Sequence, residues 1–257
     1  MARVDLNCDM GESYGAWTIG NDAAVLPHIT SASIACGFHA GDPGVMRSTV
    51  ELAVAHRVSI GAHPGLPDLV GFGRRELAVS PQDVYDMVVY QIGALQATAR
   101  SCGTALRHVK PHGALYNMAA QRRDLADAIA RAVAGVDATL VLFGLSGSAL
   151  IDAGAAHGLR TASEVFADRN YRTDGTLVPR SMPEALITDA DRAAERVVQM
   201  VRHSTVTSID GAEVHIVAQS ICIHGDAAGA PQFAQCIRAA LQSAGIAALA
   251  PGDAVHS

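Results

Sequence analysis

The sequence contains no closely spaced cysteines, no long apolar run and no excess of positive charge. Its five cysteines are far apart and odd in number, so they match neither a disulfide framework nor a zinc motif, and we interpret them as reduced thiols. The longest uncharged apolar stretch, 138–151, lies between Asp137 and Asp152 and falls short of the roughly 18 residues of a membrane span. Asp5 interrupts the N-terminus before the apolar segment of a signal peptide. We therefore expect a cytoplasmic protein that does not enter the membrane.

The charge balance and two missing motifs narrow the class of partner. Lys and Arg number 19 against 25 Asp and Glu, a formal net charge of -6, and no run of like charges occurs. Nucleic acid and anionic membranes are therefore not expected as partners, and a small molecule is. The sequence has neither a Walker A loop nor an HExxH zinc motif. Hydrophobic residues make up 49% of the chain, which is enough to bury a large core.

Short apolar segments that end in polar clusters alternate with segments of helical periodicity. This alternation predicts β/α units around a parallel sheet. Seven strands are expected, over 4–7, 31–36, 58–62, 106–110, 139–143, 159–165 and 217–223. Polar clusters after nearly every strand favour a closed parallel barrel, although seven strands would also allow an open doubly wound sheet. Since no linker or repeat divides the chain, we expect a single domain over 1–257.

Capping residues predict where the helices begin and end. Ser80 with Asp83 forms a capping-box-like start, and Gly103 suits the C-cap, of a helix over 80–102. We interpret Asp42 as the N-cap of a helix first and as a ligand second. The apolar residues of that helix are Met46, Val50 and Val54. Two more helices are expected to open at Thr188 with Asp191 and at Pro231.

One segment departs from the β/α alternation. Between Thr205 and Ile216, two β-prone runs flank Asp210 and Gly211, a pair typical of a type I′ turn. A short β-hairpin is therefore expected near 205–216, before the last strand of the barrel.

Six blocks rich in polar residues and glycine follow the predicted strands. They span 5–12, 35–43, 61–75, 109–117, 164–180 and 221–226. In a parallel barrel all strands point the same way, so residues just beyond them converge on one rim. The six blocks therefore predict one site.

Acids, histidines and cationic side chains in these blocks are the candidates for chemistry. Two acids on the loop after the first strand suit proton transfer or cation binding. Pro111 fixes the turn between Lys110 and His112 and so directs both side chains. The candidate catalytic residues are Asp9, Glu12, Lys110 and His112, and the candidate substrate ligands are His39, His63, Glu164, Arg169, Arg180, His224 and Asp226.

Metal binding and cysteine catalysis are weaker hypotheses. An Asp/His set from different strands, drawn from Asp9, His39, His63, His112 and His224 with the first three as the leading choice, would supply metal ligands. No clustered ligand motif supports the idea. Small thiols packed near strand ends are more often inert than nucleophilic. We therefore expect no catalytic role for Cys8, Cys36 or Cys222. Histidines outside the blocks, such as His108, are expected on the surface or in the core.

The six blocks, in this order, resemble those of the lactam-utilisation protein B family, to which the A component of bacterial 5-oxoprolinase belongs. The resemblance runs from Asp5 to Asp226 and is most specific in 35–43, 109–117, 164–169 and 221–226. It implies a seven-stranded barrel of the glycoside hydrolase/deacetylase type. It also implies a hydrolase subunit that takes part, with partner subunits B and C, in the ATP-dependent opening of 5-oxo-L-proline to L-glutamate.

The chemistry of this reaction leads to a hypothesis for the roles of the candidate residues. Asp9 or His112 would deprotonate the attacking water, while Lys110, Arg169 and Arg180 would neutralise carboxylate or phosphate. ATP would be a co-substrate, handled at least partly by the partner subunits because a P-loop is missing here. Two alternatives stay open at this point: a metal-dependent deacetylase or amidohydrolase acting on a sugar or small amide, and a non-catalytic subunit that only binds substrate.

Overall fold

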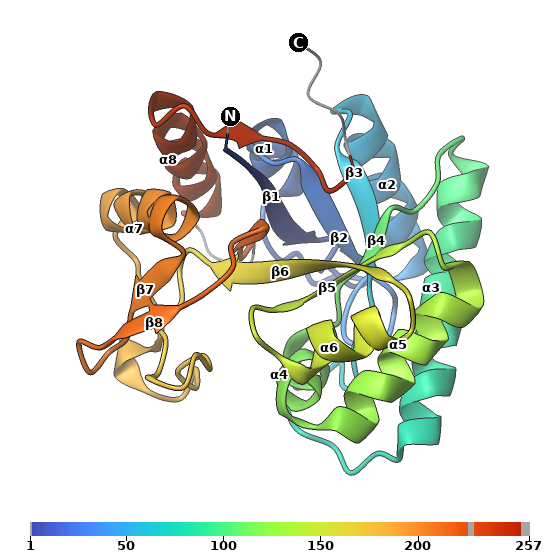
Figure 1. The fold of residues 1–257 in the computed structure, drawn as a ribbon. Helices are drawn as coiled ribbons and strands as arrows, with labels where there is room; N and C mark the ends of the chain where they lie inside the picture. Colours follow the sequence, from blue (N-terminus) through green and yellow to red (C-terminus); the bar gives the residue numbers. More distant parts are fainter. Residues whose placement is uncertain (1, 226–228, 253–257) are drawn as a thin grey trace.

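A closed barrel of parallel strands lies at the centre of the folded molecule (Figure 1). The computed structural model describes residues 2–225 and 229–252. The barrel strands are β1 (Arg3–Met10), β2 (Ser31–Ala35), β3 (Ser59–His63), β4 (His108–Val109), β5 (Val141–Leu145), β6 (Arg160–Phe166) and β9 (Ser220–Ile223). They pair in the order β1-β2-β3-β4-β5-β6-β9, and β9 pairs back with β1. The expected seven-stranded parallel barrel is confirmed, and its closure excludes the open doubly wound sheet.

The ends of the barrel differ in small ways from the predicted segments. A short strand, β10 (Ala247–Ala248), adds to the beginning of β1, where Arg3 pairs with Ala247. The last barrel strand begins at Ser220 and not at Val217, whose side chain is exposed. The apolar side chain of Val217 therefore extended the predicted strand beyond its true start.

The inside of the barrel is unusually polar, and β1 shows why. Strands of parallel sheets that are buried on both faces usually read as continuous apolar runs. In β1 the apolar Val4, Leu6, Cys8 and Met10 belong to the hydrophobic core of the domain. The alternate residues Asp5, Asn7 and Asp9 are buried as well, but their side chains bond to polar groups of other barrel strands. The period-two pattern of β1 therefore separates a helix-facing apolar side from a polar barrel interior.

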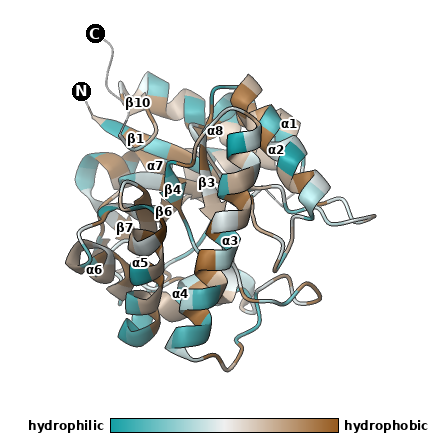
Figure 2. Cartoon of the chain, turned by 90° about the vertical axis from the view of Figure 1, so that its right-hand side faces the viewer, coloured by the Kyte–Doolittle hydropathy of each residue, from teal (hydrophilic) through white to brown (hydrophobic). Residues whose placement is uncertain are grey.

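Helices surround the barrel and cover its apolar outer side. The longer ones are α2 (Pro43–Ala55), α3 (Pro81–Ser101), α5 (Arg123–Asp137), α7 (Ala190–His203) and α8 (Ala230–Ser243), and the shorter ones are α1 (Asp22–Val25), η1 (Leu26–His28), α4 (Gly113–Gln121), α6 (Ala149–Ala156) and η2 (Pro183–Ala185). Hydrophilic and hydrophobic bands alternate along α3 in Figure 2, as expected of a helix with one buried face. Among the described residues, no helix combines the length and apolar character needed to traverse a bilayer.

The predicted caps are largely confirmed. The Ser80 side chain accepts from the Asp83 backbone N–H while Asp83 accepts from the backbone N–H of Ser80, which is a complete capping box at the start of α3. Gly103 follows this helix with a φ of 74°. Helix α7 differs, because Asp189, and not Thr188, accepts the backbone N–H of Arg192 and caps the helix.

Helix α2 begins as predicted but buries a different residue in its last turn. Asp42 accepts backbone hydrogen bonds from Gly44 and Val45 at the N-terminus, so its role as a cap is observed. Val54, which we expected in the core, is exposed, and Ala53 is buried in its place. Ala53 follows Val50 by three residues, which keeps it on the buried stripe of a helix with a period of 3.6.

The expected hairpin is present, with a different turn. Its strands are β7 (Thr205–Thr207) and β8 (Glu213–His215), paired antiparallel, and Figure 1 shows them beside α7 on one side of the barrel. A type I′ turn needs a positive φ at both central residues. Gly211 has a φ of 81°, whereas Asp210 is not among the residues with positive φ. The Gly211 N–H bonds to the Ser208 carbonyl, so Gly211 ends a four-residue turn.

A histidine of β4 is packed within the barrel and requires a glycine on the neighbouring strand β3. His108 is 1% exposed, and its ring stacks on Phe143 at a centroid distance of 4.4 Å. Its Nε2 lies 3.2 Å from the Ser33 hydroxyl. A Cβ at Gly61 would collide with the His108 ring.

We expect Gly61→Ala to lower the free energy of unfolding by about 1–3 kcal/mol, because the enclosed ring has no room to move. The matched control is Gly93→Ala, in the middle of α3, where no atom lies within 4 Å of an added Cβ. That variant should be more stable by about 0.5–1 kcal/mol, because alanine is the better helix former. Urea unfolding of both variants measures the contrast, and equal stabilities would contradict it.

Candidate functional site

A cavity of about 600 Å³ opens at the carboxyl ends of the barrel strands. Its wall includes most of the residues singled out in the sequence: Asp9, His63, Lys110, His112, Glu164, Arg169, Arg180 and His224. Glu12 and His39 are buried next to this wall, in contact with its histidines. Asp226 lies outside the described residues. The structure thus brings residues from all six blocks to one place.

Lys110 is the centre of the cavity floor. Its Nζ lies 2.6 Å from Asp9 Oδ1, 2.8 Å from Asn7 Oδ1, 3.1 Å from Glu164 Oε1 and 3.2 Å from Cys222 Sγ. Burial by itself lowers the pKa of an ammonium group, but the surrounding Asp9, Cys222 and Glu164 raise it well above the ordinary value. Lys110 is therefore charged, and its three N–H donors are taken up by protein acceptors.

Asp9 is held between this ammonium and a histidine. Its Oδ1 faces Lys110, and its Oδ2 lies 3.4 Å from His63 Nε2. Burial would favour the neutral acid, but the interactions with His63 and with the Lys110 ammonium hold the pKa of the carboxyl well below its ordinary value. Asp9 is therefore a carboxylate at the cavity wall, available to accept a proton or orient a water molecule.

Glu164 has a supporting position. Its Oε1 accepts hydrogen bonds from Asn7 and Lys110, and its Oε2 accepts one from the Tyr116 hydroxyl at 2.7 Å. The side chain is 0% exposed. With both oxygens engaged by the protein, Glu164 holds Lys110 and Tyr116 in place.

The same network continues down the barrel axis. The Asn7 amide donates to Ser220 Oγ at 2.7 Å, and Ser220 in turn donates to Asp5. Asp5 also accepts from Ser31 at 2.7 Å and from Thr30 at 2.6 Å. Burial raises the pKa of Asp5 to about 6, although these hydroxyl groups oppose the rise.

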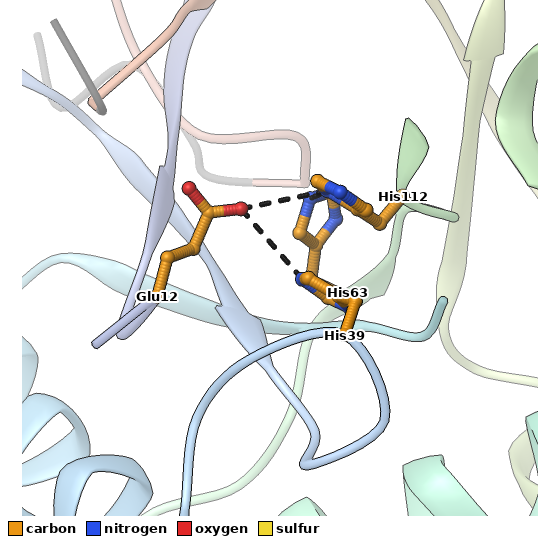
Figure 3. Close-up of side chains that lie close together, drawn as sticks. All are labelled: Glu12, His39, His63 and His112. Carbon is orange, nitrogen blue, oxygen red and sulfur yellow. Dashed lines mark hydrogen bonds and ion pairs between the residues drawn. The ribbon is translucent and has the colours of Figure 1, made fainter. Parts of the chain in front are cut away.

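Three histidines and Glu12 form a second cluster beside Asp9 (Figure 3). The rings of His39 and His112 are stacked at 3.7 Å, and His63 stands edge-on to both. Glu12 Oε1 lies 3.4 Å from His112 Nδ1 and 3.6 Å from His39 Nε2. Burial lowers the pKa of His39 and of His112 well below the ordinary value, and neighbouring histidines add to this effect. These two rings are therefore neutral.

The geometry sorts the possible metal ligands into two groups. The ligand atoms of Glu12, His39, His63 and His112 all lie within 4.8 Å of one another. Asp9, which we had considered together with His39 and His63, falls in a different group, with Cys222 and His224.

Another part of the cavity wall is basic. It is formed by the segment after β6, which a buried tyrosine, Tyr171, ties to the strand by accepting the N–H of Phe166. Arg169 is 5% exposed and donates to the carbonyl of Val178, but its Nε has no hydrogen-bond partner among the described residues. Burial and the neighbouring Arg180 lower its pKa to about 10. Both guanidinium groups line the cavity, which makes this wall suitable for an anion.

His224 lies at the cavity wall with a carboxylate behind it. Its Nδ1 lies 2.7 Å from Asp168 Oδ2. Burial would raise the pKa of Asp168, but the charges of His224, Arg180 and Arg169 lower it below the ordinary value. A carboxylate that fixes one ring nitrogen orients the imidazole for proton transfer at the other.

The cysteines near the strand ends are buried thiols. Burial raises the pKa of Cys36 to about 12 and lifts those of Cys8 and Cys222 well above the ordinary value. A protonated thiol is a poor nucleophile. The Lys110 ammonium opposes this rise in pKa at Cys8 and Cys222, but burial outweighs it.

Our sequence interpretation missed several residues of the site. Asn7 and Ser220 were passed over because neutral side chains on strands carry no distinctive signal. Asn7 alternates with Asp5 and Asp9, and this period of two placed all three on one side of β1. Tyr116 and Asp168 stood within the polar blocks, but the partners they contact are distant in sequence.

Comparison with known proteins gives consistent matches over nearly the whole chain. The model of the LamB/YcsF family matches residues 4–255. A protein from Tolumonas auensis, named as the A component of 5-oxoprolinase, is 60% identical over 96% of this chain and 98% of its own length. The protein of the same name from Bacillus subtilis is 58% identical over 96% of both chains.

Solved structures agree with these matches. The crystal structure of a lactam utilization protein from Thermus thermophilus superimposes with a TM-score of 0.91 at 49% identity, covering 96% of this chain and 99% of that one. A polysaccharide deacetylase from Bacillus cereus has a TM-score of 0.52 at 11% identity, covering 100% of this chain and 95% of that chain, and shares the fold alone.

The raised pKa of Asp5 leads us to expect that the free energy of unfolding depends on pH. Its pKa is about 6 in the folded chain against an ordinary value of 3.8, so between these values the folded state binds the extra proton. Stability therefore increases as the pH falls from about 7 to about 4, by up to about 3 kcal/mol from this group.

The variant Asp5→Asn has no titrating group here and should lose this part of the pH profile. Urea unfolding of the two chains at several values between about pH 4.5 and 7.5 gives the difference, in which other titrating groups cancel. The difference in unfolding free energy should change with pH, whereas a constant offset would show that Asp5 does not titrate in this range.

Proposed function

The chain belongs to the LamB/YcsF family, and we propose that it is the A component of a 5-oxoprolinase whose substrate binds in the cavity at the barrel rim. The observation that carries the proposal is the identity of 60% and 58%, over nearly the full length, with two relatives of that name. The substrate is then 5-oxo-L-proline, the product is L-glutamate, and ATP hydrolysis drives the reaction. Subunits B and C complete the enzyme, which works in the cytoplasm.

The chemistry sets four requirements for the site. Amide resonance protects the lactam, so its carbonyl must be activated, water must be deprotonated and the ring nitrogen must be protonated as it leaves. The substrate carboxylate must also be anchored. The cavity has groups of the right kind for the last three requirements, and ATP meets the first.

The arginine wall suits the substrate carboxylate. Arg169 is buried and carries an Nε without a hydrogen-bond partner among the described residues. The charge of the nearby Arg180 adds to its own, and Asp168 compensates only part of the two. A guanidinium binds a carboxylate through two parallel N–H donors. We assign Arg169 and Arg180 to this role, and the same wall would accept a phosphate.

We assign Lys110 a supporting role in place of direct contact with the substrate. Its three N–H donors already bond to Asn7, Glu164 and Cys222, and its charge is paired with Asp9, so no donor is left for substrate. Its contribution is to keep Asp9 ionised and in place, and to supply positive potential at the cavity floor.

ATP activates the lactam by phosphorylation. The lactam oxygen attacks the γ-phosphorus and ADP leaves, giving an imidate-like phosphate whose carbon is open to water. Water adds to this carbon, the ring C–N bond breaks and the nitrogen takes a proton. A second water then releases phosphate from the resulting acyl phosphate, so ATP and two waters yield glutamate, ADP and phosphate. Because the chain has no Walker A loop, the partner subunits are assigned at least part of the nucleotide site.

We assign the proton transfers to Asp9 and His224. Asp9 is ionised and lies at the cavity wall, so it serves as the base that accepts a proton from water. The nitrogens of His112 contact His63 and the Phe72 carbonyl, which leaves His112 less suited to that role. His224, oriented by Asp168, donates the proton to the leaving nitrogen.

Replacement of Asp9 tests the assignment of the base. In the enzyme assembled with subunits B and C, we expect Asp9→Asn to lower kcat for glutamate release from 5-oxoproline and ATP by about 10²–10⁴-fold, the usual contribution of a general base. The control is Asp86→Asn, whose carboxylate is exposed on α3 and bonded to Gln82. Full turnover by a folded, assembled Asp9→Asn enzyme would remove Asp9 from the mechanism.

The arginine wall is tested by separating binding from catalysis. We expect Arg180→Ala to raise the KM for 5-oxoproline by about 10-fold or more, because a charge-assisted hydrogen bond of roughly 1.5–3 kcal/mol is lost. The KM for ATP should change little. Arg47→Ala is the control, since Arg47 is exposed and paired with Glu51 on α2. An unchanged KM for 5-oxoproline would show that the carboxylate binds elsewhere.

A further inference from the structure

The backbone fixes which nitrogen of two buried histidines carries a proton. His63 Nδ1 lies 2.7 Å from the carbonyl oxygen of Lys110, and His112 Nε2 lies 2.8 Å from the carbonyl oxygen of Phe72. A carbonyl oxygen only accepts hydrogen bonds, so the nitrogen facing it must donate. When both rings are neutral, His63 Nε2 and His112 Nδ1 therefore hold bare lone pairs.

These two lone pairs face each other. His112 Nδ1 and His63 Nε2 are 2.9 Å apart, and both side chains are buried. Two acceptors at this distance repel unless a positively charged species lies between them. The arrangement therefore demands a proton or a cation at this point.

Two more ligands surround the same point. His39 is 0% exposed in its side chain, and neither of its nitrogens has a hydrogen-bond partner among the described residues. The Glu12 carboxylate adds a negative charge, with Oε1 3.4 Å from His112 Nδ1 and 3.6 Å from His39 Nε2 (Figure 3). Buried imidazoles without partners are rare, because each loses hydrogen bonds to water.

We propose that Glu12, His39, His63 and His112 bind one divalent transition-metal ion of the zinc type. Three imidazoles and one carboxylate form a ligand set that zinc and its neighbours prefer. In a tetrahedral site with bonds of about 2.0–2.1 Å, neighbouring ligand atoms are about 3.3–3.4 Å apart. The separations of 2.9, 3.4 and 3.6 Å in this cluster bracket that value.

The outer contacts of the cluster match those of known metal sites. Histidine ligands usually donate their second N–H to a backbone carbonyl or a carboxylate, which fixes the ring and its tautomer. His63 and His112 do so through the carbonyl groups of Lys110 and Phe72. Gly73 also leaves the room that these rings need, since a Cβ there would lie 2.7 Å from His39 Cβ and 2.9 Å from His112 Cδ2.

The second group of possible ligands is a poorer site. Asp9 and Cys222 both contact the Lys110 ammonium, which already supplies a positive charge to them. Burial also raises the pKa of Cys222 well above the ordinary value, whereas a thiol must ionise to bind a metal. The metal is therefore assigned to the histidine cluster.

Metal binding by the purified chain, without substrate or partner subunits, tests the proposal independently of the proposed function. After removal of metals with a chelator, Zn²⁺ is titrated by calorimetry, and Co²⁺ by its visible absorption. We expect one ion per chain and intense Co²⁺ bands typical of four ligands. His63→Gln and the isosteric Glu12→Gln should weaken Zn²⁺ binding by about 10-fold or more.

Matched variants distinguish the two ligand groups. His157→Gln removes a histidine that pairs with Asp127 outside the cluster, and Cys222→Ser removes a ligand of the second group. Both should bind Zn²⁺ as the parent chain does, and circular dichroism verifies that every variant is folded. The proposal is overturned if binding is far below one equivalent, if Glu12→Gln and His63→Gln bind normally, or if Cys222→Ser loses the ion. It is also overturned if ¹⁵N NMR finds a proton shared by His63 and His112 that Zn²⁺ does not displace.

Discussion

The buried ammonium of Lys110 is the interaction on which the rest of the site depends. It stands 2% exposed at the end of β4 and joins the side chains of Asp9 from β1, Glu164 from β6 and Cys222 from β9. Breaking such a buried pair by removing one partner typically costs about 3–5 kcal/mol, because the other charge is left uncompensated. The barrel therefore closes around a positive charge whose partners come from three other strands, β1, β6 and β9.

This charge explains why the barrel interior is polar. Asn7 bonds to Lys110 and Glu164 on one side and to Ser220 on the other. Ser220 in turn bonds to Asp5, near the start of β1. Buried polar groups are tolerated when each has a partner, and here strands distant in sequence provide them. A barrel filled only with apolar side chains would have no means of holding an ionised carboxylate such as Asp9 at its mouth.

The cavity above this network has two walls of opposite character. One carries carboxylates and neutral histidines around Asp9, and the other carries the guanidinium groups of Arg169 and Arg180. A small substrate with a carboxylate at one end and a reactive amide at the other matches this polarity. The network fixes the acidic wall, whereas the arginine wall belongs to the long segment after β6, so the two can be altered separately by substitution.

Apolar runs and capping residues predicted the seven strands of the barrel and most helix ends, because these depend on local periodicity. The polar blocks predicted which residues lie at the mouth of the barrel, because its strands share one direction. The sequence could not predict which acid pairs with Lys110, that His224 is held by Asp168, or that Glu12 and not Asp9 joins the three histidines. Those pairings are set by side-chain directions and by separations of a few ångströms between elements as distant in sequence as Asn7 and Ser220. Only the closed tertiary structure determines them.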